Sequence, residues 1–323
     1  MIPIITLTLN PALDISASAP LVQAGPKLRL ADPQVEPGGG GLNVARAIRA
    51  LGGQAVAMAA LGGANGGRLA ALVEEQGIDL VRFATSGETR ESLAVTENGT
   101  GQQFRFVLPG PTWSTGMTQR FLGELTDLLD QRSGRDAFVV LSGSQPAGMP
   151  AEFARDLCAA VAPARVIVDT SGPALADLVA PGKAEGTARP FVLRMDQSES
   201  EAAAGRALPT LMDSLAFARD LAARGVADVV VLAHGAEGSV LATPELALAA
   251  VPPQVPVASR VGAGDSFVAG LTLSLANGGS LTQALALGTA AAAAAVMTPG
   301  TQLCRRADVD TLLPRVRVTA GAL

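Results

Sequence analysis

The stretch AFVVLSG at residues 137–143, followed by RVIVDTS at 165–171, decides the fold of this chain. Each run is short, continuously apolar and rich in β-branched residues, and a segment with helical character separates the two. Continuous apolar runs are typical of strands buried on both faces, as in parallel sheets that helices cover. The stretch therefore predicts two parallel strands joined by a crossover helix.

Further apolar runs extend this pattern along the chain. They are IITLTLN (4–10), AVAMAAL (55–61), PFVLRMD (190–196) and DVVVLAHG (228–235). Segments with helical character follow them, the clearest being NVARAIRALGG (43–53), GRLAALVEEQG (67–77) and LPTLMDSLAFARDLAARG (208–225). This alternation predicts an α/β fold with a mainly parallel sheet flanked by helices.

Two segments, 14–36 and 88–108, instead alternate polar and apolar residues, and the second carries a turn signal at Asn98–Gly99. Both are expected to form strands exposed on one face. Two hairpins attached to the core are one interpretation. A small β-sheet lid is favoured because basic residues lie among the apolar ones: Lys27, Arg29, Arg90 and Arg105. The predicted organisation is a core of residues 1–13, 37–87 and 109–323 and a lid of residues 14–36 and 88–108.

Composition excludes several classes of protein. Hydrophobic residues make up 48% of the 323 and charged residues 16%, which predicts a large core and little disorder. The net charge of −5 and the absence of a lysine/arginine block argue against nucleic-acid binding. Two cysteines and one histidine, His234, cannot build a structural zinc site.

No membrane or secretory segment is expected either. The N-terminus MIPIITLTLNPALD lacks the basic region and apolar core of a signal peptide. The alanine-rich stretch at 284–297 is too short to span a membrane and is predicted to be a helix buried in the core. We therefore expect a cytoplasmic protein.

The stretch SRVGAGDSFVAGLTLSLANGG (259–279) carries the strongest chemical signal. Gly262, Ala263 and Gly264 precede an apolar helix, whose free N–H groups and dipole favour an anion such as a transferring phosphoryl group. Asp265 in the first turn would repel that anion, so its presence needs a reason. It could simply complement the helix dipole. Accepting the proton of an attacking hydroxyl explains it better, since the whole string is long and specific.

A second stretch, PGGGGLNVARAIRALGG (37–53), has four consecutive glycines that let backbone approach a ligand. No Gly-Lys-Ser/Thr follows, so this is not a Walker phosphate loop. Asn43 can hydrogen-bond sugar hydroxyls. A flexible turn is the alternative, but the position after the first lid segment favours the floor of a substrate site.

GGGGLNVARA and VGAGDSFVAG resemble the two signatures of the ribokinase-like, phosphofructokinase-B-type sugar kinases. Further matches in the family's order and spacing cover nearly the whole chain: TLTLNPALD (6–14), FRFVLPG (104–110), LSGSQPAG (141–148), VDTSG (168–172) and PGTQLC (299–304). The resemblance implies a ribokinase-like fold and an ATP- and Mg²⁺-dependent kinase acting on a sugar phosphate.

Within this family the chain is most similar to the type B 6-phosphofructokinases, which implies conversion of fructose 6-phosphate to fructose 1,6-bisphosphate. The 1-phosphofructokinases and tagatose-6-phosphate kinases usually have Gly-Gly-Lys-Gly where this chain has Gly-Gly-Gly-Gly at 38–41, so Gly40 favours the first activity. Those two activities stay open as alternatives. A non-catalytic regulator that binds a sugar phosphate is a third.

The resemblance also assigns roles to matching residues. Asp265 is the implied catalytic base, and Gly262, Ala263 and Gly264 form its anion hole. The implied sugar contacts are Asp14, Gly39, Gly40, Asn43 and Ser144. The sugar's own phosphate is expected to meet Arg90, Arg105, Lys27 and Arg29, cations suited to phosphate. Lids in this family often pair, which implies a homodimer in which some of these residues come from the neighbouring subunit.

On the nucleotide side, Gly235 and Gly238 match a nucleotide-binding turn, and His234 between the strand and this turn is expected to pack. Ala233 stands where relatives often have serine or threonine. Relatives organise the magnesium-bound triphosphate with Lys-Pro-Asn-x-x-Glu, whereas this chain has Arg194, Asp196 and Glu199 in that motif. Asp196 and Glu199 are the candidate Mg²⁺ residues. A monovalent cation, K⁺, is implied at Ser259, Val261, Ala295, Thr298, Gly300 and Gln302.

Overall fold

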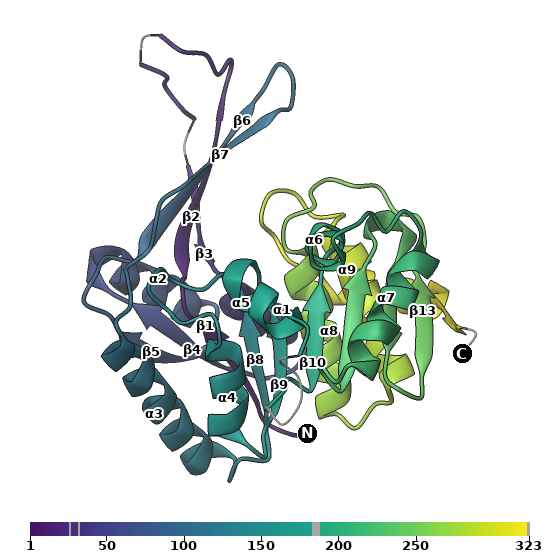
Figure 1. The fold of residues 1–323 in the computed structure, drawn as a ribbon. Helices are drawn as coiled ribbons and strands as arrows, with labels where there is room; N and C mark the ends of the chain where they lie inside the picture. The colour runs from purple at the N-terminus through teal and green to yellow at the C-terminus, as the bar shows by residue number, and fades with distance from the viewer. Residues whose placement is uncertain (26, 32, 183–187, 322–323) are drawn as a thin grey trace.

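The computed structural model describes residues 1–25, 27–31, 33–182 and 188–321. A broad main body carries a narrow extension that rises from one side (Figure 1). The main body is built on a ten-stranded sheet in the order β14-β13-β12-β11-β10-β9-β8-β1-β4-β5. The extension is a separate four-stranded sheet, β3-β2-β6-β7.

Seven strands of the large sheet are parallel, and six of them are the apolar runs predicted from the sequence. Their bounds are β1 (Ile4–Thr8), β4 (Val56–Leu61), β5 (Asp79–Ala84), β8 (Phe138–Ser142), β9 (Arg165–Asp169), β10 (Val192–Met195) and β11 (Val229–Ala233). Antiparallel strands β12 (Ser239–Ala242), β13 (Ala247–Val251) and β14 (Arg317–Ala320) extend one edge. The predicted α/β fold class is confirmed.

Helices cover both faces of this sheet, since alternate residues of one strand belong to different apolar clusters. Val139 and Leu141 of β8 belong to the cluster that includes α3 (Thr115–Arg132), α4 (Phe153–Val161), α5 (Gly172–Val179) and α7 (Leu211–Ala223). Phe138 and Val140 belong to the cluster that includes α1 (Gly40–Ala50), α8 (Ala263–Ala276), α9 (Leu281–Ala295) and α10 (Arg306–Leu312). The remaining α-helices are α2 (Gly63–Glu75) and α6 (Gln197–Ala204).

The predicted alanine-rich helix is α9, which is largely buried and lies beside α8 (Figure 1). Among the described ranges, no helix combines the length and apolarity needed to cross a membrane. Cys158 and Cys304 are both buried and unpaired.

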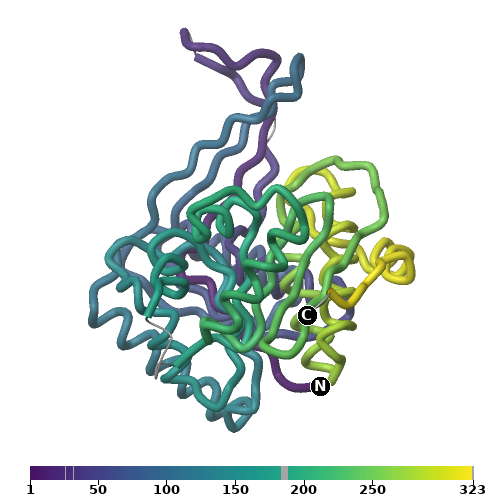
Figure 2. Tube along the Cα trace, turned by 45° about the vertical axis from the view of Figure 1, so that its right-hand side comes forward, coloured from purple at the N-terminus to yellow at the C-terminus, as the bar shows by residue number. Residues whose placement is uncertain are grey.

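The small sheet projects beyond the main body as a twisted ribbon (Figure 2). It comprises β3 (Gln34–Gly38), β2 (Ala12–Ala19), β6 (Arg90–Glu97) and β7 (Gln103–Val107). The β2–β6 pair is parallel and the outer pairs are antiparallel. The predicted Asn98–Gly99 turn begins the connection from β6 to β7. In the predicted strand segment 14–36, the described residues between Ala19 and Gln34 are irregular, and Pro26 and Asp32 lie outside the described residues.

Candidate active site

The candidate active site begins at the N-terminus of α8. Gly262, the residue before the helix, has φ 78°, a left-handed conformation that glycine adopts without strain. It has no side chain to cap the helix, so the first N–H groups of α8 are left for a ligand. Asp265 lies in this first turn.

A pocket of about 190 Å³ opens beside this turn. Residues at the carboxyl ends of β8, β9 and β10 line it, which is where ligands bind in open α/β sheets. The lining residues are Ser142, Gly143, Ser144, Asp169, Thr170, Ser171, Arg194, Glu199, Gly264 and Asp265. The fold thus brings together five predicted site residues from distant parts of the chain: Ser144, Arg194, Glu199, Gly264 and Asp265.

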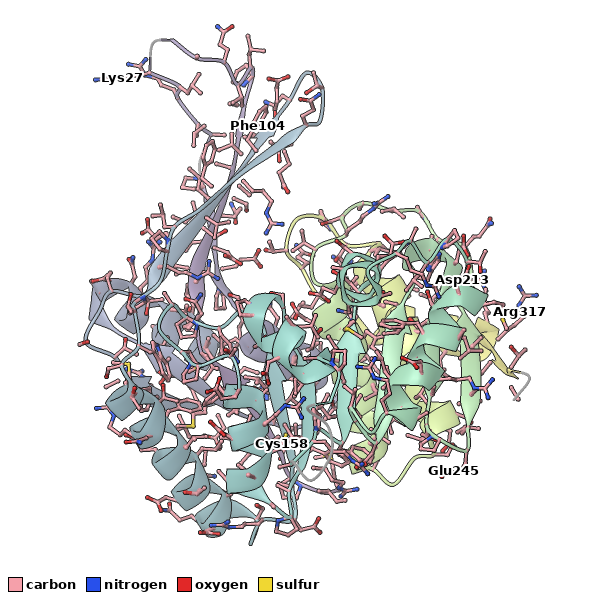
Figure 3. The ribbon with its side chains drawn as sticks, in the orientation of Figure 1. Lys27, Phe104, Cys158, Asp213, Glu245 and Arg317 are labelled. Atoms are coloured by element: carbon pink, nitrogen blue, oxygen red, sulfur yellow. The ribbon has the colours of Figure 1, made fainter. Side chains whose placement is uncertain are left out.

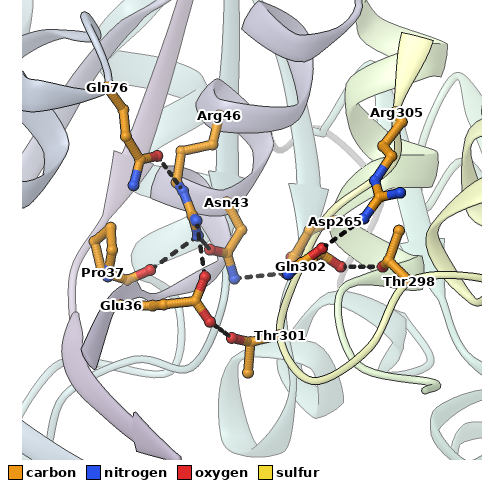
Figure 4. A network of polar contacts seen from close by, with 10 residues as sticks. All are labelled: Glu36, Pro37, Asn43, Arg46, Gln76, Asp265, Thr298, Thr301, Gln302 and Arg305. Atoms are coloured by element: carbon orange, nitrogen blue, oxygen red, sulfur yellow. Dashed lines mark hydrogen bonds and ion pairs between the residues drawn. The ribbon is translucent and has the colours of Figure 1, made fainter. Parts of the chain in front are cut away.

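Burial raises the pKa of Asp265 to about 6, and the nearby Asp169 carboxylate adds to that rise. Asn43 opposes it, because its Nδ2 donates a hydrogen bond to Asp265 Oδ2 at 3.0 Å (Figure 4). The positive charge of Arg194 also opposes it. A carboxyl with this pKa is ionised at neutral pH yet basic enough to accept a proton in a transition state.

Arg194 places a permanent positive charge beside the helix terminus. Its Nη1 donates to Asp169 Oδ1 at 3.1 Å, and both side chains are nearly buried, at 12% and 11% exposed. A Cβ on Gly264 would lie 3.1 Å from Arg194 Nη1, so the guanidinium lies against the first turn of α8. The free N–H groups and this guanidinium together fit the phosphates of ATP.

Asp196 and Glu199 form a reciprocal cap at the start of α6. Asp196 Oδ1 accepts from Glu199 N at 2.8 Å, and Glu199 Oε2 accepts from Asp196 N at 2.8 Å. Burial raises the pKa of Glu199 to about 7. Mg²⁺ in kinases is held by one or two carboxylates, phosphate oxygens and water, and Glu199 in the pocket lining fits that role. Metal contact by Asp196, whose Oδ1 serves as the helix cap, stays a prediction.

The predicted nucleotide turn follows β11, the neighbour of β10 in the sheet. Ala233 ends this strand, and Gly235 begins a short 3-10 turn. Gly238 has φ 127°, and a Cβ there would lie 2.0 Å from the Ala250 carbonyl oxygen, so only glycine fits. His234 is buried, with Nδ1 3.1 Å from Ser214 Oγ, in agreement with its predicted packing role.

The residues predicted to hold a monovalent cation come from two segments that contact each other. Ser259 Oγ donates to the Gly300 carbonyl at 2.7 Å, and Thr298 Oγ1 donates to the Ala295 and Gln302 carbonyls at 2.7 and 2.8 Å. Val261 N donates to Ser259 Oγ at 3.1 Å. A gathering of carbonyl and hydroxyl oxygens is the donor set that K⁺ requires. The cation site itself stays a prediction.

The residues predicted to contact the sugar phosphate include Asp14 and Arg90, which belong to the small sheet, the predicted lid. Asp14 on β2 is paired with Glu36 on β3, and burial raises its pKa against the opposing charges of Arg90 and Arg105. A Cβ on Gly38 would lie 2.1 Å from Asp14 Oδ2, so a glycine at this position leaves room for the carboxylate.

Arg90 and Ser144 reach the same region through Asn10. Arg90 Nε donates to the Asn10 carbonyl at 3.2 Å, and Asn10 Nδ2 donates to Ser144 Oγ at 3.3 Å. Arg90 on β6, Asp14 on β2 and Ser144 after β8 therefore meet where the lid joins the large sheet.

Lys27 and Arg29 are placed differently. Both are exposed, and Lys27 lies at the tip of the lid, far from the main body (Figure 3). Within one chain the fold does not bring them to the pocket. Their predicted contact with the sugar's phosphate therefore requires a second chain.

Several residues of the site were not predicted, among them Asp169, Asn10 and Arg46. Asp169 ends the strand RVIVD, and Asn10 follows IITLTL. Ligands bind at the carboxyl ends of strands in open α/β sheets, so the position of these two polar residues could have identified them as site candidates. Arg46 lies three residues after Asn43 on α1, and residues three apart are neighbours on a helix surface. Its Nη1 donates to Asn43 Oδ1 at 3.0 Å.

The profile of the pfkB family carbohydrate kinases matches residues 4–308. The chain belongs to this family. The chain is 39% identical over 312 residues to an ATP-dependent 6-phosphofructokinase isozyme 2 of Mycobacterium tuberculosis, covering 95% of this chain and 88% of that protein. A 1-phosphofructokinase of Xanthomonas campestris is 37% identical over 273 residues, covering 84% of this chain and 83% of that protein.

A solved structure, phosphofructokinase-2 from Escherichia coli in complex with potassium, superposes with a TM-score of 0.88 at 36% identity and covers 98% of this chain and 99% of its own. The chain is therefore a carbohydrate kinase with the ribokinase-like fold, a phosphotransferase, as the sequence predicted. The pocket lining by Gly264 and Asp265 argues against the alternative of a non-catalytic regulator, which rests on the altered motif at Asp196.

Proposed function

We propose that this kinase transfers the γ-phosphoryl group of ATP to the 1-hydroxyl of fructose 6-phosphate, giving fructose 1,6-bisphosphate and ADP. The supporting observation is the position of Asp265, which contacts Asn43 on the sugar side and lines the pocket with Arg194 on the phosphate side. Arg90 and Arg105 near Asp14 supply positive charge for an acceptor that is already phosphorylated.

The chemical step follows from this arrangement. The hydroxyl oxygen attacks the γ-phosphorus while its proton passes to the Asp265 carboxylate. A new O–P bond forms as the bond from the γ-phosphorus to the bridging oxygen breaks, which releases ADP. The N–H groups of α8 and the Arg194 guanidinium stabilise the charge on the phosphoryl oxygens. Mg²⁺, held by Glu199 and phosphate oxygens and by Asp196 through water, would neutralise part of that charge.

Gly40 supports fructose 6-phosphate over the alternative sugars. A Cβ at residue 40 would lie 2.4 Å from Ser142 Oγ, 2.6 Å from the Ser142 carbonyl carbon and 2.7 Å from Gly143 N. Any side chain at residue 40 would require the backbone at Ser142–Gly143 to shift, including the lysine that 1-phosphofructokinases and tagatose-6-phosphate kinases usually carry here. The resemblance of Gly-Gly-Gly-Gly at 38–41 to the type B 6-phosphofructokinases supports 6-phosphofructokinase activity.

A coupled assay for ADP with saturating Mg-ATP tests this proposal on fructose 6-phosphate, fructose 1-phosphate, tagatose 6-phosphate and fructose. We expect kcat/KM to be highest for fructose 6-phosphate, and ³¹P NMR to place the new phosphate at carbon 1. Preference for fructose 1-phosphate or tagatose 6-phosphate would overturn the assignment of the substrate. Binding of a sugar phosphate without turnover would support the regulator instead.

We also propose that two copies pair through their lids. The lid and its loops expose large apolar side chains: Leu21, Leu28, Leu30, Phe106, Val107 and Leu108. Apolar side chains gathered on a projecting sheet favour burial against a partner, and a second copy would bring its own Lys27 and Arg29 toward the facing chain. Sedimentation velocity across a concentration series is expected to show a dimer.

Subunit complementation tests whether Lys27 crosses between copies. The Lys27→Ala and Asp265→Asn variants, each impaired alone, are co-expressed with different tags. The dimer that carries both tags is then purified. One site of that dimer combines an intact Lys27 with an intact Asp265, so activity should return to about half of wild type. A mixed dimer as inactive as its parents would show that both residues act within one chain.

A further inference from the structure

The Arg46 side chain of α1 lies beside Asn43, on the side away from Asp265 (Figure 4). Its Nη1 donates to Asn43 Oδ1 and to the Pro37 carbonyl, both at 3.0 Å. Its Nε donates to Gln76 Oε1 at 2.7 Å, and its Nη2 lies 3.6 Å from Glu36 Oε1. With the side chain only 11% exposed, the guanidinium is fixed on several sides.

These contacts determine which way the Asn43 carboxamide points. A carboxamide has one accepting and one donating end, whereas a guanidinium can only donate. Arg46 therefore holds the Asn43 oxygen and directs the NH₂ group at Asp265 Oδ2, 3.0 Å away. A rotated carboxamide would place NH₂ against the guanidinium and its oxygen against the carboxylate, and both contacts would be repulsive.

The same guanidinium joins the base to the root of the lid. Pro37 and Glu36 belong to β3 of the lid sheet. Glu36 in turn accepts a hydrogen bond from Thr301 Oγ1, in the loop that follows α9 and carries predicted cation ligands. A continuous series of polar contacts thus runs from Asp265 through Asn43, Arg46 and Glu36 to Thr301 (Figure 4).

We propose that Arg46 is a positioning residue for phosphoryl transfer: it orients Asn43 toward Asp265 and ties that pair to lid strand β3. Arg46 is not among the residues that line the pocket, and it acts through Asn43. The inference rests on the role of Asp265 as the base and does not depend on which sugar phosphate is the acceptor.

The electrostatic consequence can be derived from the charged groups around Asp265. Asp169 of β9 disfavours its ionisation, while Arg194 of β10 and Arg46 of α1 favour it. Loss of Arg46 removes one positive charge and releases the Asn43 carboxamide to rotate. Both changes raise the pKa of Asp265, so the acidic limb of the pH profile should move to higher pH.

Steady-state kinetics of Arg46→Met and Arg46→Lys test the proposal. We expect kcat of Arg46→Met to fall roughly tenfold to a hundredfold, with the KM for ATP within about twofold, since misplacement of a catalytic group by a distant change has effects of this order. The acidic limb of kcat/KM for the sugar should move up. Arg46→Lys retains the charge but not the planar fork, so it should recover only part of the loss.

Two controls separate positioning from general destabilisation. Arg155→Met removes another buried arginine, one paired with Asp177 on the other face of the sheet. It should lower the melting temperature without moving the acidic limb. In a double-mutant cycle, Arg46→Lys should lower kcat less in the Asn43→Ala background than in the wild type. The reason is that Arg46 acts through Asn43, so its replacement has little effect once Asn43 is removed. An unmoved pH profile in both Arg46 variants, or additive effects in the cycle, would overturn the proposal.

Discussion

The main body and the lid of this kinase differ in how completely their apolar residues are buried. All five residues of β8 in the large sheet are buried, whereas β7 at the edge of the lid has four exposed residues and one half-buried residue. Phe106 and Val107 of β7 are 53% and 58% exposed despite their size. Asp265 is held by contacts within one chain, whereas the lid keeps large apolar side chains exposed.

This contrast predicts that changes in the main body stop chemistry, whereas changes in the lid weaken binding of the sugar. Asp265→Asn tests the first half most severely. It should lower kcat by about a hundredfold to ten-thousandfold, because asparagine keeps the shape but cannot accept the proton. The coupled assay measures kcat, and circular dichroism verifies the fold.

Asp213→Asn is the matched control for that variant. Asp213 occupies the same first-turn position of α7 as Asp265 does of α8, but it caps its helix at the surface (Figure 3). Its replacement should leave kcat unchanged. Near-normal turnover of Asp265→Asn under saturating substrates would refute the assignment of the base.

Arg90→Ala tests the contribution of the lid root. Loss of a charge-assisted contact to the sugar's phosphate should raise the KM for fructose 6-phosphate about tenfold to a hundredfold, with little change in the KM for ATP. Arg82→Ala, which breaks an exposed ion pair with Glu74, should change neither KM. Equal increases for both substrates would place Arg90 outside the sugar site.

The pH profile tests the raised pKa of Asp265, which arises from burial and charges within the main body. The pKa of Asp265 is raised to about 6, and the base must be ionised, so kcat/KM should fall as pH drops below about 6. An ordinary aspartate would show this loss only near pH 4, at about its model-peptide pKa. The profile is measured from pH 4.5 to 8.5, and a flat profile down to pH 5 contradicts the raised pKa.

Phe106→Glu tests the proposed lid pairing. A charge on the apolar face should dissociate the dimer and lower kcat/KM for the sugar about fivefold to tenfold, since an unpaired charge in an interface is costly. Sedimentation and the coupled assay report the two effects. Met212→Glu provides the control, because Met212 is 58% exposed on α7 of the main body. A dimeric, fully active Phe106→Glu variant would show that the exposed lid face is not the interface.

The smallest effect is expected from Asp196→Asn. Asparagine and aspartate cap helices equally well, so the start of α6 should stay intact. Removing the carboxylate should make activity depend less steeply on free Mg²⁺, with a change in the KM for ATP of about threefold or less. Mg²⁺ titrations at fixed ATP compare the two proteins. Identical titrations would show that Asp196 serves only as a helix cap.

Much of the fold follows from local pattern. The six apolar runs became parallel strands, because a strand buried on both faces must be apolar throughout. The antiparallel strands β12, β13 and β14 were not predicted. They are short and close one edge of the sheet by pairing with neighbours, so their position depends on the partner strands more than on their own pattern.

The sequence by itself determined the helix terminus at Gly262–Asp265, because a small-residue turn before an apolar helix leaves free N–H groups wherever it occurs. Only the tertiary structure decided how that terminus is surrounded. Asp169 reaches Arg194 across 25 residues, and Asn43 reaches Asp265 across 222. The raised pKa of Asp265 arises from this burial and these neighbours. Such contacts depend on strand order and helix placement, and periodicity along the chain carries no information about either.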